Sequence, residues 1–291
     1  MKIVLCFVAI FFLNVFLFSQ QFLGGPGDTK GTAWEIWTKD DLIKLSDSIN
    51  NSGARTRFVH NKHFRLMANI NDTLTQSIGW NSVTCHFNGS GYRITVNITT
   101  SNIPPYSVGS VFGSLQGTID SLIVDGYIIN GNAGITGTNS GTISNCINNI
   151  NIVYTIAEVA AGGIARTNNG TIINCINNGS VSGEGSVGGI AASIGIEGQI
   201  ISCINTGNIT TEGIIKTSAG GIVGFVAGSY APYPTLISNC INYGFTKGAD
   251  KVGGILGLMM FNTHNVQIIN CINTGVVEGN SNVGAILGQE Q

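Results

Sequence analysis

Short apolar runs rich in Ile and Val recur from about residue 81 to the end of the chain, and Gly, Asn, Ser and Thr separate them. Short runs bounded by turn-forming residues are typical of strands, because a helix needs a longer stretch with a period near 3.6. The pattern therefore predicts strands of roughly three to six residues joined by tight turns.

These runs belong to an internal repeat of about 30 residues. Five copies share Ile, Cys, Ile and Asn at fixed positions: Ile143–Asn148, Ile172–Asn177, Ile200–Asn205, Ile237–Asn242 and Ile268–Asn273. A second element follows each of them: Ala161–Ile164, Val187–Ile190, Ala219–Ile222, Val252–Ile255 and Val283–Ile286, with Gly-Gly at its centre in all but the last. Two weaker copies precede them, around Phe87–Ile94 and Gly117–Leu122.

A unit of this size cannot bury enough apolar surface to fold alone, so each unit must lie on the next. A right-handed parallel β-solenoid does this by placing equivalent residues about 4.8 Å apart along one axis. We therefore predict an all-β solenoid over residues 81–291.

Stacking would bring identical side chains into columns. The predicted columns are Cys146, Cys175, Cys203, Cys240 and Cys271, and Asn148, Asn177, Asn205, Asn242 and Asn273. We expect buried, reduced cysteines, because neighbours in register do not readily reach disulfide torsions, and a hydrogen-bonded asparagine ladder at a corner. The isoleucines three before and one after each cysteine are expected to form aliphatic ladders. Strict alternation cannot turn both of them and the cysteine inward without a bend.

Residues 21–80 do not repeat and predict an N-terminal cap segment. Thr38-Lys-Asp-Asp41 resembles a capping box and predicts a helix at about residues 39–50. Alternation predicts a strand at about residues 63–71. We expect the helix to cover the open edge of the first turn. No polar cap is evident at the other end, which suggests self-association or a larger assembly there.

The first 20 residues indicate where the protein is located. Lys2 precedes an apolar stretch over residues 3–18 that is shorter than the ~20 residues of a spanning helix, and Ser19 follows. This pattern predicts a signal peptide over residues 1–20 and a secreted or cell-surface protein. An uncleaved anchor is the alternative, because Leu17 is bulky for a cleavage site.

Composition narrows the class further. Gly accounts for 41 of 291 residues, charged residues for 10%, and the net charge is −2. A chain of low charge that is 43% hydrophobic is not a charged disordered segment. It also carries no basic footprint for nucleic acid, so no nucleic-acid partner is expected.

At the glycine-rich elements the chain resembles the GLUG-motif repeat family. Gly221–Gly224, Gly254–Gly257 and, loosely, Ala285–Gly288 carry the likeness, although Gly163–Arg166 and Gly189–Ala192 lack the closing Gly. Segments similar to these repeats occur in bacterial surface adhesins and in immunoglobulin-A-cleaving metallopeptidases, where they lie outside the catalytic domain. The resemblance thus implies a surface protein of adhesin type and gives no catalytic residue to carry over.

Candidates for catalysis are few. Asp120 and Asp125 are the only close carboxylate pair after Gly117, and paired carboxylates could serve a polysaccharide lyase or hydrolase. The competing interpretation is solvated groups at strand ends. His60 and His63 could hold a metal, but solvated loop histidines explain them as well. The chain has no CxxC and no HExxH motif. We therefore predict no enzyme activity, no metal and no cofactor.

Candidates for ligand binding lie around the longest interval between repeats. Tyr230 and Tyr233 stand in the predicted loop 228–236, and Phe225 and Tyr243 flank it. Aromatic loop tips often contact partners, but such a loop can also pack on its own scaffold. We expect adhesion to a host or matrix protein or a glycan. The alternative is a structural spacer in a larger surface assembly.

Overall fold

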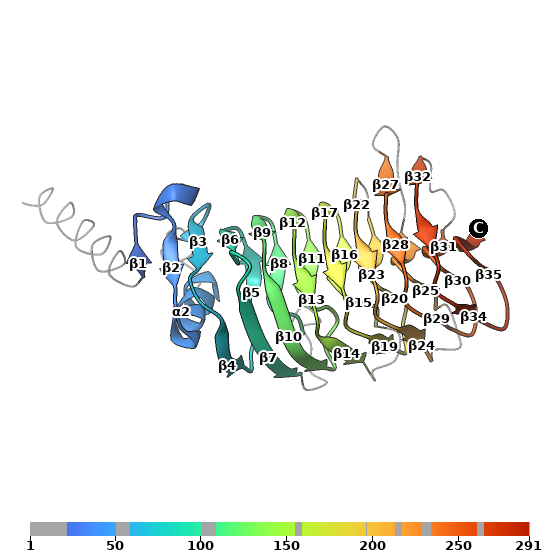
Figure 1. The fold of residues 1–291 in the computed structure, drawn as a ribbon, viewed down its shortest axis with the longest axis horizontal. Coiled ribbons are helices and arrows are strands. Elements are labelled where there is room, and N and C mark those ends of the chain that lie inside the picture. Colours follow the sequence, from blue (N-terminus) through green and yellow to red (C-terminus); the bar gives the residue numbers. More distant parts are fainter. Residues whose placement is uncertain are drawn as a thin grey trace, which may run out of the picture.

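The computed structural model describes residues 22–50, 59–100, 109–154, 159–195, 197–212, 217–227, 234–260 and 265–290. Over these ranges the parallel strands form a β-solenoid of about seven turns with one α-helix, which confirms the predicted all-β solenoid. Figure 1 shows the turns stacked along one long axis, with α2 (Lys39–Asn50) at the N-terminal end. The predicted signal peptide lies outside the described residues. Among the described ones, no helix is long and apolar enough to cross a bilayer.

Four sheets run along the solenoid. The 10-stranded sheet contains β1 (Leu23–Gly24), β2 (Trp34–Ile36), β3 (His63–Leu66), β6 (His86–Asn88), β9 (Thr118–Asp120), β12 (Thr142–Ser144), β17 (Thr171–Ile173), β22 (Gln199–Ile201), β27 (Thr235–Ser238) and β32 (Val266–Ile269). The 13-stranded sheet contains β4 (Ile70–Leu74), β7 (Arg93–Thr99), β10 (Ile123–Ile129), β13 (Ile147–Asn148), β14 (Asn151–Tyr154), β18 (Ile176–Asn177), β19 (Val181–Gly183), β23 (Ile204–Asn205), β24 (Ile209–Thr211), β28 (Ile241–Asn242), β29 (Thr246–Lys247), β33 (Ile272–Asn273) and β34 (Val277–Glu278).

The other two sheets are shorter. The 8-stranded sheet contains β5 (Ile78–Val83), β8 (Phe112–Leu115), β11 (Thr136–Asn139), β16 (Ala165–Asn168), β21 (Ala191–Ile194), β26 (Val223–Val226), β31 (Leu256–Met259) and β36 (Leu287–Glu290). The 5-stranded sheet contains β15 (Ala161–Gly162), β20 (Val187–Gly188), β25 (Ala219–Gly220), β30 (Val252–Gly253) and β35 (Val283–Gly284). One turn therefore runs through β20, β21, β22, β23 and β24 before β25 begins the next.

A sharp bend precedes every repeat cysteine. The residue before it has a left-handed backbone conformation, as in Asn145 (φ 54°), Asn174 (φ 55°) and Ser202 (φ 53°). Asn is among the residues that most readily adopt it. The bend turns both the cysteine and the asparagine two residues later inward, where both are fully buried in the middle turns. The isoleucine between them points outward, half-buried, so only the isoleucine three before the cysteine joins the core.

The five repeat cysteines lie in one column, which is buried except at the half-buried Cys271, and they form no disulfide among the described residues. Each thiol donates to two carbonyl oxygens, one two residues earlier and one in the preceding turn. For Cys175 these are Ile173 at 3.4 Å and Ile143 at 3.7 Å. Burial raises the pKa of the Cys175 thiol, so it stays protonated. Cys85 is also buried but lies outside this column, one residue before β6.

The buried asparagines form a continuous hydrogen-bonded ladder. The Nδ2 atom of Asn177 donates to Oδ1 of Asn205 at 2.8 Å, and that of Asn205 donates to Oδ1 of Asn242 at 2.8 Å. Each amide also donates to the carbonyl two residues on, for example Asn205 to Gly207 at 2.9 Å. Every amide in the middle of the ladder is thereby satisfied inside the core.

The asparagine ladder fills space left by the second glycine of each Gly-Gly element. A Cβ atom on Gly189 would lie 2.5 Å from Cγ of Asn205 and 2.1 Å from the Gly221 carbonyl oxygen. Gly163, Gly221 and Gly254 face the asparagines of their own turns in the same way. The two repeated motifs are thus parts of one packing unit, although the facing glycine and asparagine are 14 to 21 positions apart along the chain.

A second, exposed ladder runs along the outside of the same sheet. Asn149 donates to Asp125 at 2.6 Å, Asn178 donates to Asn149 at 2.8 Å, and the Thr206 hydroxyl donates to Asn178 at 2.8 Å. Its donors point toward the N-terminal turns, opposite to those of the buried ladder. It ends on a carboxylate, which only accepts.

The N-terminal cap is built around α2. Its capping box forms, because the Asp41 amide donates to Thr38 Oγ1 at 3.3 Å and the Thr38 amide donates to Asp41 Oδ2 at 3.1 Å. Leu42, Leu45 and Ile49 are buried on the face that packs against β5. At the adjacent edge, β1 pairs antiparallel with β2.

Replacing one buried ladder asparagine should be costly. We expect Asn205→Ala to lower the free energy of unfolding by about 3 kcal/mol, because it leaves buried amide groups of Asn177 and Asn242 without their partners. The matched control, Asn178→Ala in the exposed ladder, should change it by about 0.5 kcal/mol or less. Urea denaturation measures both, and equal losses would contradict the structural role of the buried ladder.

The glycine facing the ladder should be equally intolerant. We expect Gly189→Ala to destabilise the protein by about 2–3 kcal/mol, since its Cβ has no space beside Asn205. Gly183→Ala is the control, because the nearest atom to its Cβ would be 3.5 Å away, an ordinary contact. Thermal melts compare the two, and a Gly189→Ala protein as stable as the Gly183→Ala protein would refute the packing argument.

Candidate functional site

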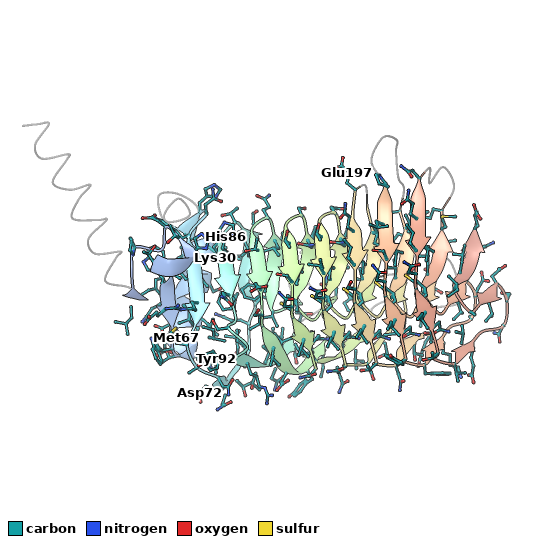
Figure 2. The ribbon with its side chains drawn as sticks, turned by 45° about the horizontal axis from the view of Figure 1, so that its top comes forward. Lys30, Met67, Asp72, His86, Tyr92 and Glu197 are labelled. Carbon is teal, nitrogen blue, oxygen red and sulfur yellow. The ribbon has the colours of Figure 1, made fainter. Side chains whose placement is uncertain are left out.

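An open groove of about 620 Å³ lies on the outer face of the 10-stranded sheet, near its N-terminal end. Its floor is formed by β3, β6, β9 and β12, and Lys30 of the 3-10 helix η1 (Lys30–Thr32) stands at its rim. Figure 2 shows Lys30 and His86 on this part of the molecule. The polar residues that line the groove are Lys30, His63, Arg65, His86, Asn88, Thr118, Asp120, Thr142, Ser144 and Asn145.

Strand register places these side chains in two columns. In each strand a central apolar residue points into the core, namely Phe64, Phe87, Ile119 and Ile143, and its two neighbours point outward. The residues before it form the column His63, His86, Thr118 and Thr142. The residues after it form the column Arg65, Asn88, Asp120 and Ser144. A polar groove is thereby built on the same stacking that builds the core.

Two histidines stack at the N-terminal end of the groove. The His63 and His86 rings lie with centroids 4.6 Å apart and planes inclined by 22°. Nδ1 of His86 lies 3.0 Å from the Thr118 hydroxyl. Burial and the nearby charge of Lys30 lower the pKa of both imidazoles. Both rings are therefore mostly neutral near pH 7.

Lys30 is the cation of the groove that has no acidic partner among the described residues. Lys62 pairs with Asp28, and Arg65 pairs with Glu35 at 3.5 Å. The exposed Lys30 forms no such pair in the described ranges, yet its charge is felt by both histidines and by Asp120. The N-terminal end of the groove is thus a region of positive potential.

Asp120 is held as an ionised hydrogen-bond acceptor. Ser144 Oγ and Asn145 Nδ2 donate to its Oδ1 at 2.6 and 2.8 Å, and the Ser121 hydroxyl donates to its Oδ2 at 2.9 Å. Burial opposes ionisation, but these hydrogen bonds outweigh it and lower the pKa of Asp120. A general acid needs the opposite shift.

The structure does not bring together the two carboxylates considered for sugar chemistry. Asp120 lies in β9 of the 10-stranded sheet, whereas Asp125 lies in β10 of the 13-stranded sheet. Asp125 forms an ion pair with Arg93 at 2.7 Å and accepts the hydrogen bond from Asn149. Their closeness in sequence therefore does not produce a catalytic pair, because the bend at Ser121 separates them onto two faces.

The predicted aromatic site is only partly visible. Tyr230 and Tyr233 lie outside the described residues. Phe225 is half-buried in β26 of the 8-stranded sheet, in register with Ser193 and Leu258. Tyr243 follows β28 of the 13-stranded sheet and is 55% exposed. These two side chains belong to different faces of the solenoid, so they do not form one site with each other.

The sequence pattern does not identify most of the groove residues as members of one site. His63 was paired with His60, but its structural neighbour is His86, which lies 23 residues later and one turn on. Among the described residues no cluster of three or more His, Cys, Asp or Glu could hold a metal. Aligning the weak N-terminal copies on Phe64, Phe87 and Ile119 would have revealed the polar columns.

Comparison with known proteins supports the fold. The chain is similar to a crystal structure of a putative immunoglobulin A1 protease from Bacteroides ovatus, with a TM-score of 0.58 and 23% sequence identity. The match covers 91% of this chain and 74% of that chain. At this identity the likeness concerns the β-solenoid alone. No protein-family model matches the chain, and no curated protein matches it.

The histidine pair predicts a loss of stability in mild acid. A histidine whose pKa is lower in the folded than in the unfolded state stabilises the protein above the unfolded value of about 6.5, and this contribution is lost as the pH falls through the folded value. We expect the free energy of unfolding to decrease from pH 7 to pH 5, and less steeply in a His63→Gln/His86→Gln variant. Asp250, with a pKa of about 2, keeps its contribution in this window. Urea denaturation at each pH measures the slope, and identical slopes would contradict the assignment.

Proposed function

We propose that this protein is an exported, non-enzymatic binding module of adhesin type, and that the groove on the 10-stranded sheet is its ligand site. The observation that carries the proposal is the groove itself, where four successive strands present eight polar side chains, and Lys30 and Asn145 add two more, around about 620 Å³ of open space. Binding sites are concave and use a few convergent polar groups for specificity. Both features occur here on a rigid scaffold.

A binding role is favoured over hydrolysis by the state of the carboxylates. Asp120 accepts three hydrogen bonds, and Asp125 is ion-paired on another face. Neither is placed as an acid poised to donate a proton. The word protease in the name of the similar structure belongs to that protein, and the shared solenoid does not carry its chemistry to this chain.

The signal-peptide pattern and the resemblance to GLUG-motif repeats support export and a surface location as parts of the same proposal. A host or matrix protein or a glycan is the expected partner. A spacer role is the second candidate. The 10-stranded and 13-stranded sheets run through the described turns without interruption, and such a rod could hold another domain away from the cell surface.

A bulky residue in the groove should abolish binding. Immobilised glycans and extracellular-matrix proteins are probed with the full chain and with Thr142→Trp, whose ring would fill the outward column between Thr118 and Thr171. We expect at least tenfold weaker binding for this variant. The control is Thr210→Trp, an outward, half-buried threonine of β24 on another sheet, which should bind like the parent protein.

Three outcomes would contradict the proposal. If Thr142→Trp binds like the parent protein, the groove is not the site. If neither the parent chain nor its variants bind any probe, the result would favour the spacer role over the binding role. Incubation with immunoglobulin A1 is included as a check on activity, and specific cleavage by the parent chain would overturn the non-enzymatic role.

A further inference from the structure

The two ends of the groove differ in chemistry. Toward the N-terminus it presents a cation and two imidazoles, from Lys30, His63 and His86. Toward the C-terminus it presents hydroxyl and amide groups, from Thr118, Thr142, Ser144 and Asn145, together with the carboxylate of Asp120. A ligand that fills the groove must therefore complement the cationic end with one of its ends and the hydroxyl and amide groups with the other.

The charge at the N-terminal end of the groove is complementary to an anionic group of a ligand. Lys30 has no acidic partner within the described residues, and its charge already opposes protonation of both imidazoles. A ligand anion at this end would compensate that charge and allow the imidazole N–H groups to donate to it. The one carboxylate of the lining, Asp120, feels the charge of Lys30 but forms no ion pair with it among the described residues. Its Oδ1 is turned toward Ser144 and Asn145 of the next turn.

The other end calls for hydroxyl groups. Side-chain hydroxyls and amides both donate and accept, so they suit a ligand covered with hydroxyls better than an apolar one. A peptide strand added to the sheet is excluded at this place, because β6, β9 and β12 are each paired on both sides and offer no free edge. From β3 to β12 the groove spans three strand spacings, about 14 Å, which is long enough for more than one sugar ring.

From this order of groups we infer that the groove binds an acidic saccharide, with its carboxylate or sulfate at Lys30, His63 and His86 and its hydroxyls at Thr118, Thr142 and Ser144. The inference rests on the proposed function and specifies the ligand class. Arg65 remains paired with Glu35 and flanks the acidic group.

The test measures binding of three oligosaccharides to the full chain by calorimetry. The probes are a galacturonic-acid tetrasaccharide, a sulfated galactose tetrasaccharide and an uncharged galactose tetrasaccharide. We expect at least one acidic probe to bind about tenfold or more tightly than the uncharged one, as a charge-assisted hydrogen bond implies. Comparison of the first two distinguishes carboxylate from sulfate as the anion.

Three variants locate the effect. Lys30→Met should reduce the preference for the acidic probe over the uncharged one about tenfold, because Lys30 is placed to contact the anion and not the hydroxyl groups. His63→Gln/His86→Gln should weaken binding of the acidic probe in the same direction. The matched control is Lys247→Met, which removes an exposed lysine paired with Glu278 at the other end of the solenoid and should change nothing.

The outcomes separate this inference from the proposed function. Equal affinity for charged and uncharged probes, lost in Thr142→Trp, would overturn the acidic class and keep the groove as a binding site. If Lys247→Met and Lys30→Met change the affinity for the acidic probe equally, the anion does not bind at Lys30, and the placement of the anion is overturned. No saccharide binding, together with matrix-protein binding through the groove, would overturn the saccharide class. Circular dichroism of Lys30→Met verifies that the variant is folded.

Discussion

The solenoid depends on one buried contact, in which the asparagine amide of each turn packs against a glycine that has no Cβ atom to occupy the same space. Asn205 donates to Asn242 and accepts from Asn177, and Gly189 leaves room for it. A buried amide is costly unless every donor and acceptor is paired. Here pairing is possible only if successive turns are in register, because each amide finds its partner in the next turn. The buried aliphatic columns already oppose a one-residue slip, which would turn them outward. The polar ladder adds to this, because any slip would leave its amides without partners.

Because the register is fixed, the outward residues of successive turns also lie in columns, as the inward residues do. In the C-terminal turns the outward residues after the central isoleucine include Ile173 and Ile201, which are half-buried and aliphatic. In the N-terminal turns the corresponding residues are Arg65, Asn88 and Asp120. The groove thus lies where the outward residues become polar while the inward residues stay large and apolar. Stability depends on the inward face of these strands, and the proposed binding site uses their outward face.

This division explains what could be predicted from the sequence. The solenoid and the alignment of its columns follow from the spacing of Cys146, Cys175 and Cys203, because identical residues at one period imply stacking. The orientation around each cysteine did not follow, since it depends on the left-handed residue before it, and two-residue periodicity fails across such a bend. The groove was missed because its turns carry Phe64 and Phe87 where later turns carry isoleucine, so the outward histidines were not aligned.

The bend also explains why a cysteine recurs at this position. The column lies directly after a left-handed residue, where the chain turns into the core and two carbonyls lie near the side chain, as Ile173 and Ile143 do for Cys175. A thiol is small, apolar enough for burial and able to donate weakly to both oxygens. Leu122 takes the same place in an earlier turn, so a thiol is not obligatory there. The column is therefore a packing solution at the bend, and its repeated cysteines need no disulfide or metal to account for them.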